Sequence, residues 1–331
     1  MNGREHHVFI LVTATVPLLG VVVAMVLLWN QAVMLPDLVA FLVMFLFTGF
    51  GISTGYHRLL AHRSFQTSRP VKLFFTVGGA MAGQGPPLIW TAHHRRHHRV
   101  ADKAGDPHSP WADLEPGIRG ALKGLWHSHL GWLFNKDLTS DPMRYCPDLA
   151  RDRDVRFISK HFVAFVVAGL LLPGLIGLAW TGTLTGFLTA VLWGGLVRFV
   201  AQNHATYAVN SVGHYFGSRR FATADESRNV FWLSLPSFGE AWHNNHHAFP
   251  RSYRHGMRWY EIDPSMIVIA TLEKLGLAWN VMRIDPERIT MKAEGMARAG
   301  GGRQAPAHAP QSPLAEKGTD QLATVGVSDV E

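Results

Sequence analysis

The sequence predicts an all-α membrane protein with four transmembrane helices, arranged as two hairpins beneath a cytoplasmic helical cap that carries a di-metal histidine site. Three observations support this prediction. Of the 331 residues, 47% are hydrophobic and only 17% are charged, against about 25% charged residues in an average soluble domain. The hydrophobic residues form long runs, and many of the 19 histidines gather between those runs.

Composition also limits the kind of site and partner. The single cysteine excludes an internal disulfide bond and a thiolate metal cluster, so metal ligands must be nitrogen or oxygen atoms. The net charge of +7 suits either nucleic acid or a membrane surface. The apolar runs favour the membrane, and we expect no nucleic-acid partner.

The first hairpin is predicted at residues 8–62. Its first span, Val8 to Trp29, contains no charged residue and is long enough to cross a bilayer. No small-residue cleavage site follows this span, so we expect it to be retained rather than removed as a signal peptide. The second span is Leu38 to Ile52, and its helix is expected to continue past the membrane and carry His57 and His62.

The second hairpin is predicted at residues 161–203, with spans from Val163 to Trp180 and from Phe187 to Gln202. Neither hairpin turn contains lysine or arginine, whereas the segments outside the hairpins are rich in both. The positive-inside rule therefore places both turns outside and the other segments in the cytoplasm. These cytoplasmic segments are residues 1–7, 63–160 and 204–296; the tail at 297–331, rich in Gly, Pro, Ala and Gln, is expected to be disordered.

Two segments between the hairpins are apolar without being predicted spans. Residues 71–90 contain a lysine, several glycines and two prolines. If they crossed the membrane, His57 and His94 would lie on opposite sides, so we expect a buried or interfacial segment. Residues 117–134 are predicted to form an interfacial helix, because tryptophans such as Trp126 and Trp132 favour the headgroup level.

Three histidine motifs, called boxes below, lie in the predicted cytoplasmic parts. They are H-x4-H at His57 and His62, H-x2-H-H at His94, His97 and His98, and H-x2-H-H at His243, His246 and His247. Imidazole is the commonest metal ligand, and eight imidazoles exceed the need of one ion, so we expect two. The ligand type alone leaves Fe, Zn, Cu and Ni open. Positions i and i+5 of an α-helix lie about 140° apart, so the first two histidines either serve different metals or straddle the helix end.

The boxes resemble, in order and spacing, those of the integral-membrane fatty acyl desaturases, in particular a bacterial form of the acyl-CoA Δ9 (stearoyl-CoA-type) branch. The residues that carry this likeness are Gly55 to His62, His94 to His98, Asn210 to His214 and His243 to Pro250, within a matching region of about residues 8–290. The resemblance implies two iron ions, with His214 as a ninth ligand and Asn210 reaching the metal through water.

The resemblance also implies an activity and partners. It points to an O2-dependent desaturase that introduces a cis double bond, at the Δ9 position, into a saturated acyl thioester such as acyl-CoA. No cytochrome b5-like segment is found in the sequence, so an external electron donor is expected, such as a ferredoxin with its reductase. The implied location is a bacterial inner membrane, with the active site on the cytoplasmic side of a multi-pass protein.

A substrate tunnel follows from the same resemblance. Its predicted walls are Gln84, Trp90, Thr206 and Tyr207 around the bend of the acyl chain, and Phe41 and Phe45 at the far end, where they would limit chain length. Tyr207 stands where the family usually has tryptophan.

The carrier of the acyl chain is left open by one departure from the family. Animal enzymes have Arg-Asp before the second box, where it contacts the CoA nucleotide, and this chain has Ala92-His93. Lys136 matches another basic position, but Asp137 follows it. Acyl carrier protein and a lipid-bound chain therefore remain alternatives to CoA.

Several carboxylates lie near the boxes in the sequence and could orient the histidine rings. Asp106, Asp225 and Glu240 are candidates to accept the second ring protons of the ligands, and Glu240 is preferred because it precedes His243 by three residues. The other central histidines are expected outside the ligand set: His93, His108, His127, His129 and His204. The arginines of the first two boxes could face an anionic substrate or form salt bridges.

Two other functions remain open from sequence. A membrane hydroxylase or oxygenase would use a similar metal centre, although the N-S-x-x-H and H-x2-H-H-A-F-P segments favour a desaturase. A metal-binding or transport protein would need histidines or carboxylates inside the spans, and the first three spans contain none.

Overall fold

The computed structural model describes residues 16–30, 33–111, 117–135 and 139–298. Within them the protein is mostly helical, as predicted, with one pair of two-residue strands. Three continuous helical segments are long and apolar enough to cross a membrane, namely Leu35–Ala61, Phe162–Thr181 and Leu184–Tyr215. They contain the second, third and fourth predicted spans. This indicates a membrane protein.

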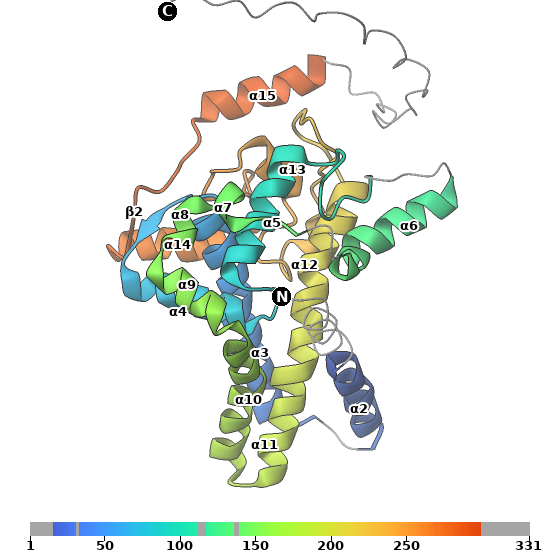
Figure 1. Ribbon diagram of the computed structural model, residues 1–331, viewed down its shortest axis with the longest axis vertical. Coiled ribbons are helices and arrows are strands. Elements are labelled where there is room, and N and C mark those ends of the chain that lie inside the picture. Colours follow the sequence, from blue (N-terminus) through green and yellow to red (C-terminus); the bar gives the residue numbers. More distant parts are fainter. Residues whose placement is uncertain (1–15, 31–32, 112–116, 136–138, 299–331) are drawn as a thin grey trace, which may run out of the picture.

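The first long segment consists of α3 (Leu35–Phe50) and η2 (Gly51–Ala61). The second is α10 (Phe162–Thr181). The third consists of α11 (Leu184–Ala190), η5 (Val191–Val197) and α12 (Arg198–Tyr215). They run roughly along the long axis of the molecule (Figure 1). The first predicted span is described only as α2 (Val16–Asn30), which packs against η5. Residues 8–15 lie outside the described residues, so the described part of the chain shows three full-length spans rather than four.

The outward face of α10 is apolar. Its exposed side chains recur every three or four residues: Val163, Val167, Leu171, Leu175 and Leu178. A contiguous apolar face of this length is typical of a helix in contact with lipid. The inward face packs closely on α11, where a Cβ atom at Gly177 would lie 1.9 Å from the carbonyl oxygen of Gly186, as is common between small residues of membrane helices.

Residues 71–90 form two helices instead of one span. They are α4 (Arg69–Met81) and α5 (Pro87–Val100), separated by a turn in which Gly83 adopts φ +76°. Helix α4 crosses η2 so closely that a Cβ atom at Gly51 would lie 2.1 Å from the backbone nitrogen of Gly79. After this turn α5 packs against η2, which carries the first box.

The remaining elements form a cap at the end of the bundle opposite the α10–α11 turn (Figure 1). They are α7 (Pro142–Tyr145), α8 (Pro147–Ala150), α9 (Arg153–Lys160), η6 (Phe231–Leu233), α13 (His243–Ala248), α14 (Pro264–Lys274), α15 (Pro286–Arg298), and the antiparallel strands β1 (Gln66–Thr67) and β2 (Ala278–Trp279). A buried apolar core joins η2 to α5, α8, α9 and α14; it includes Ile52, Tyr56, Ala92, Leu149 and Ile269.

The predicted interfacial helix is α6 (Ile118–His129), followed by η3 (Gly131–Phe134). It projects sideways from α12 (Figure 1). Ile118, Leu122 and Trp126 lie on one face at spacings of four residues and are 78%, 61% and 58% exposed. An exposed apolar stripe of this kind suits the surface of a bilayer.

Candidate metal centre

The first box lies on a π-helix. In η2 the backbone N–H of His62 donates to the carbonyl of His57 at 3.0 Å, an i to i+5 bond. The two rings therefore return to one side of the helix, with centroids 4.7 Å apart. The α-helical angle of about 140° does not apply here, and the first two histidines join the same group at the end of the helix.

The second box divides between two directions. His94 and His98 lie four residues apart on one face of α5 and approach the first box; the Nε2 atoms of His62 and His94 are 2.7 Å apart. His97 points elsewhere, because it is three residues from His94 and one from His98, and its Nε2 atom lies 3.4 Å from that of His247. One short helix thus supplies ligands in two directions.

The third box divides in the same way on α13. His246 Nε2 lies 3.1 Å from His57 Nε2 and 2.9 Å from His98 Nε2. His243 and His247 face each other at 3.1 Å on the other side, and His214, near the end of α12, approaches His243 at 2.9 Å. The split leaves every one of the nine predicted histidines in one of two groups.

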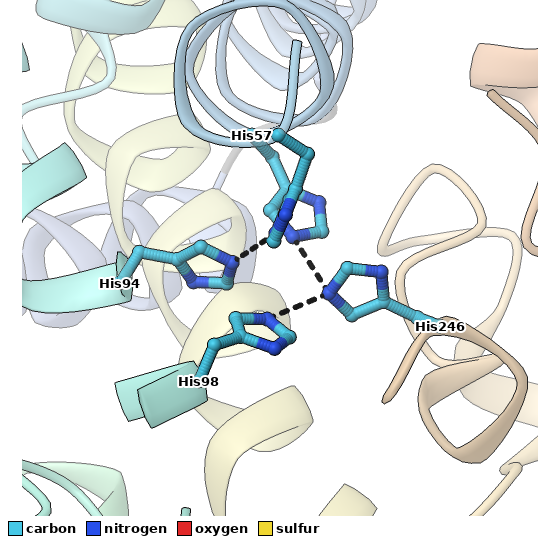
Figure 2. A group of neighbouring side chains, drawn as sticks. His57, His94, His98 and His246 are labelled. Atoms are coloured by element: carbon cyan, nitrogen blue, oxygen red, sulfur yellow. Dashed lines mark hydrogen bonds between the residues drawn. The ribbon is translucent and has the colours of Figure 1, made fainter. Parts of the chain in front are cut away.

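These two groups are defined by convergent ring nitrogens. The five-histidine group contains His57, His62, His94, His98 and His246, and the four-histidine group contains His97, His214, His243 and His247. Figure 2 shows four members of the first group pointing toward one another from different parts of the chain. Within each group the ligand atoms lie within 4.8 Å of one another, which fits a metal ion with bonds of about 2.1 Å to imidazole nitrogen.

The remaining contacts fix the third box in place. Asn244 Oδ1 accepts backbone N–H groups of Arg220 and Phe221, both at 2.8 Å. Asn245 Nδ2 donates to the carbonyl oxygen of His255 and to Glu261, both at 2.9 Å. The two asparagines of the motif therefore hold α13 to the loops on either side rather than facing the imidazole groups.

Carboxylates lie within hydrogen-bonding distance of the outward Nδ1 of three of the imidazoles, and a fourth carboxylate forms an ion pair with His57. Asp106 binds His97, Asp102 binds His214 and Asp225 binds His247, each at 2.9 Å. Glu240 contacts His57 rather than His243, because α13 begins only at His243 and Glu240 lies in the preceding turn. Asp102 was missed in the sequence, where nothing but its position just after the second box distinguishes it.

The protonation states suit metal binding. Burial lowers the pKa of five imidazoles well below the ordinary value of histidine, so they are neutral at pH 7; these are His62, His94, His98, His243 and His246. Burial alone would raise the pKa of Asp102, but the charge of His214 and several hydrogen bonds lower it to about 2. The pKa values of Asp106, Asp225 and Glu240 are also lowered, against the effect of burial, mainly by His97, His247 and His57 respectively. Neutral imidazoles and ionised carboxylates are the forms in which these groups coordinate and support a metal.

Two further buried residues adjoin the five-histidine group. Arg58 is fully buried and forms ion pairs with Asp263 at 2.9 Å and with Glu240 at 3.3 Å. His255 lies 3.2 Å from the guanidinium and packs on His246 with ring centroids 4.4 Å apart. Of the two interpretations of Arg58, the salt bridge is therefore correct. His255 belongs to none of the three boxes, so no motif identifies it.

Close packing explains the glycine before Glu240. Gly239 adopts φ +94°, and a Cβ atom there would lie 2.2 Å from Asp263 Oδ1. Only glycine allows the chain to turn this tightly beside the buried Arg58 ion pairs.

Four further histidines that the structure describes, namely His93, His108, His129 and His204, lie outside both groups. His93 packs on Trp132 and lies within hydrogen-bonding distance of Ser140. His129 bridges His204 and Ser211 at 2.9 Å each. His108, expected to be an ordinary loop residue, is buried and packs on His97 at 4.5 Å between ring centroids.

Two arginines of the second box differ in their surroundings. Arg95 pairs with Asp148 at 2.7 Å and also donates to the backbone of Leu60 and Ala61. Arg99 is exposed. Lys136, the possible carrier contact, lies outside the described residues.

The predicted tunnel residues occupy two regions. Gln84 Nε2 donates to Thr206 Oγ1 at 2.8 Å, and Trp90 stacks on His94 at 5.1 Å. Tyr207 donates a hydrogen bond to Asn203 at 3.2 Å. Asn210 lies one helical turn before His214 on α12.

The second region is aromatic. Phe41 and Phe45 of α3 stack at 5.6 Å, and Phe45 also contacts Phe238 at 5.4 Å. Phe238 has no place in the sequence prediction, since it comes from the loop before the third box.

Known proteins resemble this chain along most of its length. Residues 35–281 match the fatty acid desaturase family. The chain is 40% identical over 282 residues to the hex-5-enoyl-[acyl-carrier protein] acetylenase of Moorena producens (strain JHB), covering 85% of this chain and 87% of that protein. It is 39% identical over 252 residues to the sn-1 stearoyl-lipid 9-desaturase of Anabaena variabilis, covering 76% and 85% of the two chains. It is 38% identical over 251 residues to the icosanoyl-CoA 5-desaturase of Limnanthes douglasii, covering 73% and 65%. With its histidine groups and apolar helices, the chain belongs to the fatty acid desaturase family.

Proposed function

We propose that this protein is an O2-dependent di-iron desaturase that introduces a cis double bond, at the Δ9 position, into a saturated acyl chain. The observation that carries the proposal is the convergence of nine imidazoles into two adjacent groups, within a chain of the desaturase family. The five-histidine group would hold one iron ion and the four-histidine group the other, with Asn210 contributing through water. When bound, the metal pair supplies the reduction of O2 and the removal of hydrogen from an unactivated carbon chain.

The chain's own residues orient this centre and keep it dry. Asp102, Asp106, Asp225 and Glu240 hold their imidazoles with Nε2 inward, because each accepts the Nδ1 proton. Most of the ligating side chains are buried, which excludes water from a reactive site.

The acyl chain would pass along two regions of the protein. Gln84, Trp90, Thr206 and Tyr207 would enclose it beside the metal groups, where Trp90 already stacks on His94. Phe41 and Phe45 would close the far end, supported by their contact with Phe238.

The proposed substrate is a fatty acyl thioester, delivered on CoA. The relatives named above act on acyl-carrier-protein, lipid and CoA substrates, so acyl carrier protein and lipid are the alternatives. His93 stands where the animal enzymes have the aspartate of the Arg-Asp pair, so this chain has no carboxylate at that position; His93 packs on Trp132 instead. Purified protein supplied with the same chain on CoA, on acyl carrier protein or in a lipid separates the three by product formation.

The proposed location is the inner membrane of a bacterium, with the cap in the cytoplasm, where an external donor such as a ferredoxin with its reductase would deliver electrons. The absence of lysine and arginine from both hairpin turns supports this orientation.

Expression in a host that lacks the activity tests the proposal. Under aerobic conditions with a ferredoxin system, fatty-acid analysis should show a new cis-monounsaturated chain. The His243→Ala variant should produce none. A host without the new chain, or a fully active variant, would contradict the proposal.

A further inference from the structure

The two histidine groups differ in the carboxylates behind them. Three of the four imidazoles in the four-histidine group donate Nδ1–H to a carboxylate: His97 to Asp106, His214 to Asp102 and His247 to Asp225. In the five-histidine group one carboxylate is found among the described contacts, Glu240 on His57. The electrostatic environments of the two groups are therefore unequal.

The charge of that one carboxylate is also partly cancelled. Glu240 accepts hydrogen bonds from the fully buried Arg58, at 3.3 Å to Nη2. It also accepts the hydroxyl of Ser53. The Nδ1 atom of His246 is buried and has no hydrogen-bond partner among the described residues, as is also the case for Nδ1 of His243 in the four-histidine group. A metal ion held by the five-histidine group would therefore have a buried cation, Arg58, nearby.

The carboxylates of the four-histidine group receive hydrogen bonds from neutral groups instead. Asp102 accepts the Ser109 hydroxyl at 2.6 Å and the backbone N–H of Glu226 at 2.7 Å. Asp225 accepts the backbone N–H of Ser227 at 3.0 Å. These bonds hold the two carboxylates in place beside the imidazoles of His214 and His247.

We propose that the four-histidine group is the higher-affinity metal site and keeps its ion after the five-histidine group has been emptied. This rests on the proposed di-metal function. A carboxylate on Nδ1 makes Nε2 a stronger donor to the metal and fixes its orientation, and losing one such partner costs about 10- to 100-fold in metal affinity. The five-histidine group has one more imidazole, which favours metal binding there, but this imidazole is neutral and adds no negative charge. A buried divalent charge is stabilised most by the fixed anions around it.

Cobalt(II) is a suitable probe, because it binds imidazole sites and its retention is measured without turnover. Full-length protein in detergent is loaded with Co²⁺, exposed to increasing chelator and separated from free metal. Co²⁺ per chain is then read by elemental mass spectrometry, together with visible absorption. Wild type should fall from two ions to a plateau at one, and only then to none.

Matched variants show which histidine group holds the ion that is retained at the plateau. Asp225→Asn should weaken the retained ion by about 10- to 100-fold, and Asp106→Asn serves as a second case if the first does not fold. Glu240→Gln should leave the retained ion unchanged and weaken only the first one released. Folding of each variant is checked by circular dichroism and gel filtration.

The outcomes separate this inference from the proposed function. Release of both ions together, or loss of the retained ion in Glu240→Gln but not in Asp225→Asn or Asp106→Asn, would overturn the affinity order while leaving two metals in place. Folded wild type that binds fewer than two Co²⁺ ions before any chelator is added would contradict the di-metal function itself. Stepwise release with the predicted variant pattern supports both.

Discussion

Replacing Arg58 tests whether the buried ion pairs of the cap hold the first box in place. The guanidinium is fully buried, pairs with Asp263 and Glu240, and donates to the carbonyl oxygen of Tyr253 at 2.8 Å. Arg58→Met keeps most of the side-chain volume but leaves two carboxylates without their cation. Breaking a buried ion pair in this way costs about 3–5 kcal/mol of stability.

The expected loss is measurable as a fall in the thermal unfolding midpoint in detergent. At roughly 2 °C per kcal/mol for a large chain, the midpoint should fall by about 6–10 °C. Arg69→Met is the matched control, because Arg69 also pairs with an aspartate, Asp154 at 2.8 Å, but is exposed. An exposed pair is screened by water and contributes little to stability, so this control should shift the midpoint far less than Arg58→Met does.

A charge-neutral combination distinguishes the ion pairs from simple packing. Arg58→Met combined with Asp263→Asn and Glu240→Gln removes the uncompensated charges and should recover most of the lost midpoint. The reasoning is refuted if Arg58→Met is no less stable than Arg69→Met, or if the neutral combination is the least stable variant of all.

Three further predictions concern other parts of the molecule. Phe45→Ala should shift the products toward longer chains in fatty-acid analysis. The control Phe47→Ala should not, because the Phe47 ring packs on Phe74 at 5.0 Å. Equal product lengths in the two variants would count against Phe45 as a residue that closes the tunnel. Burial raises the pKa of the Cys146 thiol to about 11, so maleimide at pH 7 should label it only after denaturation, and rapid labelling of folded protein would show that the thiol is accessible. Burial lowers the pKa of His243 and His246 below the value of about 6.5 in an unfolded chain. Below pH 6.5 the unfolded metal-free chain therefore binds protons that the folded chain does not, and stability should fall by up to about 1.4 kcal/mol per pH unit for each group; an unfolding midpoint that is the same at pH 7.5 and pH 5.5 would argue against this.

The histidines that converge could be selected from the sequence, but their arrangement could not. H-x2-H-H spacing is local, so it can be recognised without the fold. The division of each box between two groups depends on where α5 and α13 point, and that is set by packing between distant segments. The grouping of His57 with His62 depended on a π-helix, which their spacing alone does not reveal.

The supporting residues were harder to predict because their partners are distant in sequence. Glu240 was expected to support His243, three residues away, but it contacts His57, which reaches it only after the cap folds onto η2. Asp102 and His214 are separated by more than a hundred positions and meet through the turn after α5. Arg58 lies within the first box, but its partners Asp263 and Glu240 are 205 and 182 positions away. His255 carries no motif, and only its burial identifies it.

The helical spans were predictable because hydrophobicity and length suffice for them. The apolar residues 71–90 required a second argument, namely that His57 and His94 must share a site. The structure agrees with that argument by dividing the segment at Gly83.

The central claim is that this protein removes two hydrogens from an acyl chain rather than inserting oxygen. A perdeuterated saturated fatty acid, supplied aerobically to a host expressing the protein, distinguishes the two by mass spectrometry of the product. The account predicts a product that has lost two deuterium atoms and gained no oxygen, and that disappears in the His243→Ala variant. A product that carries an added oxygen atom would contradict the account and identify a hydroxylase.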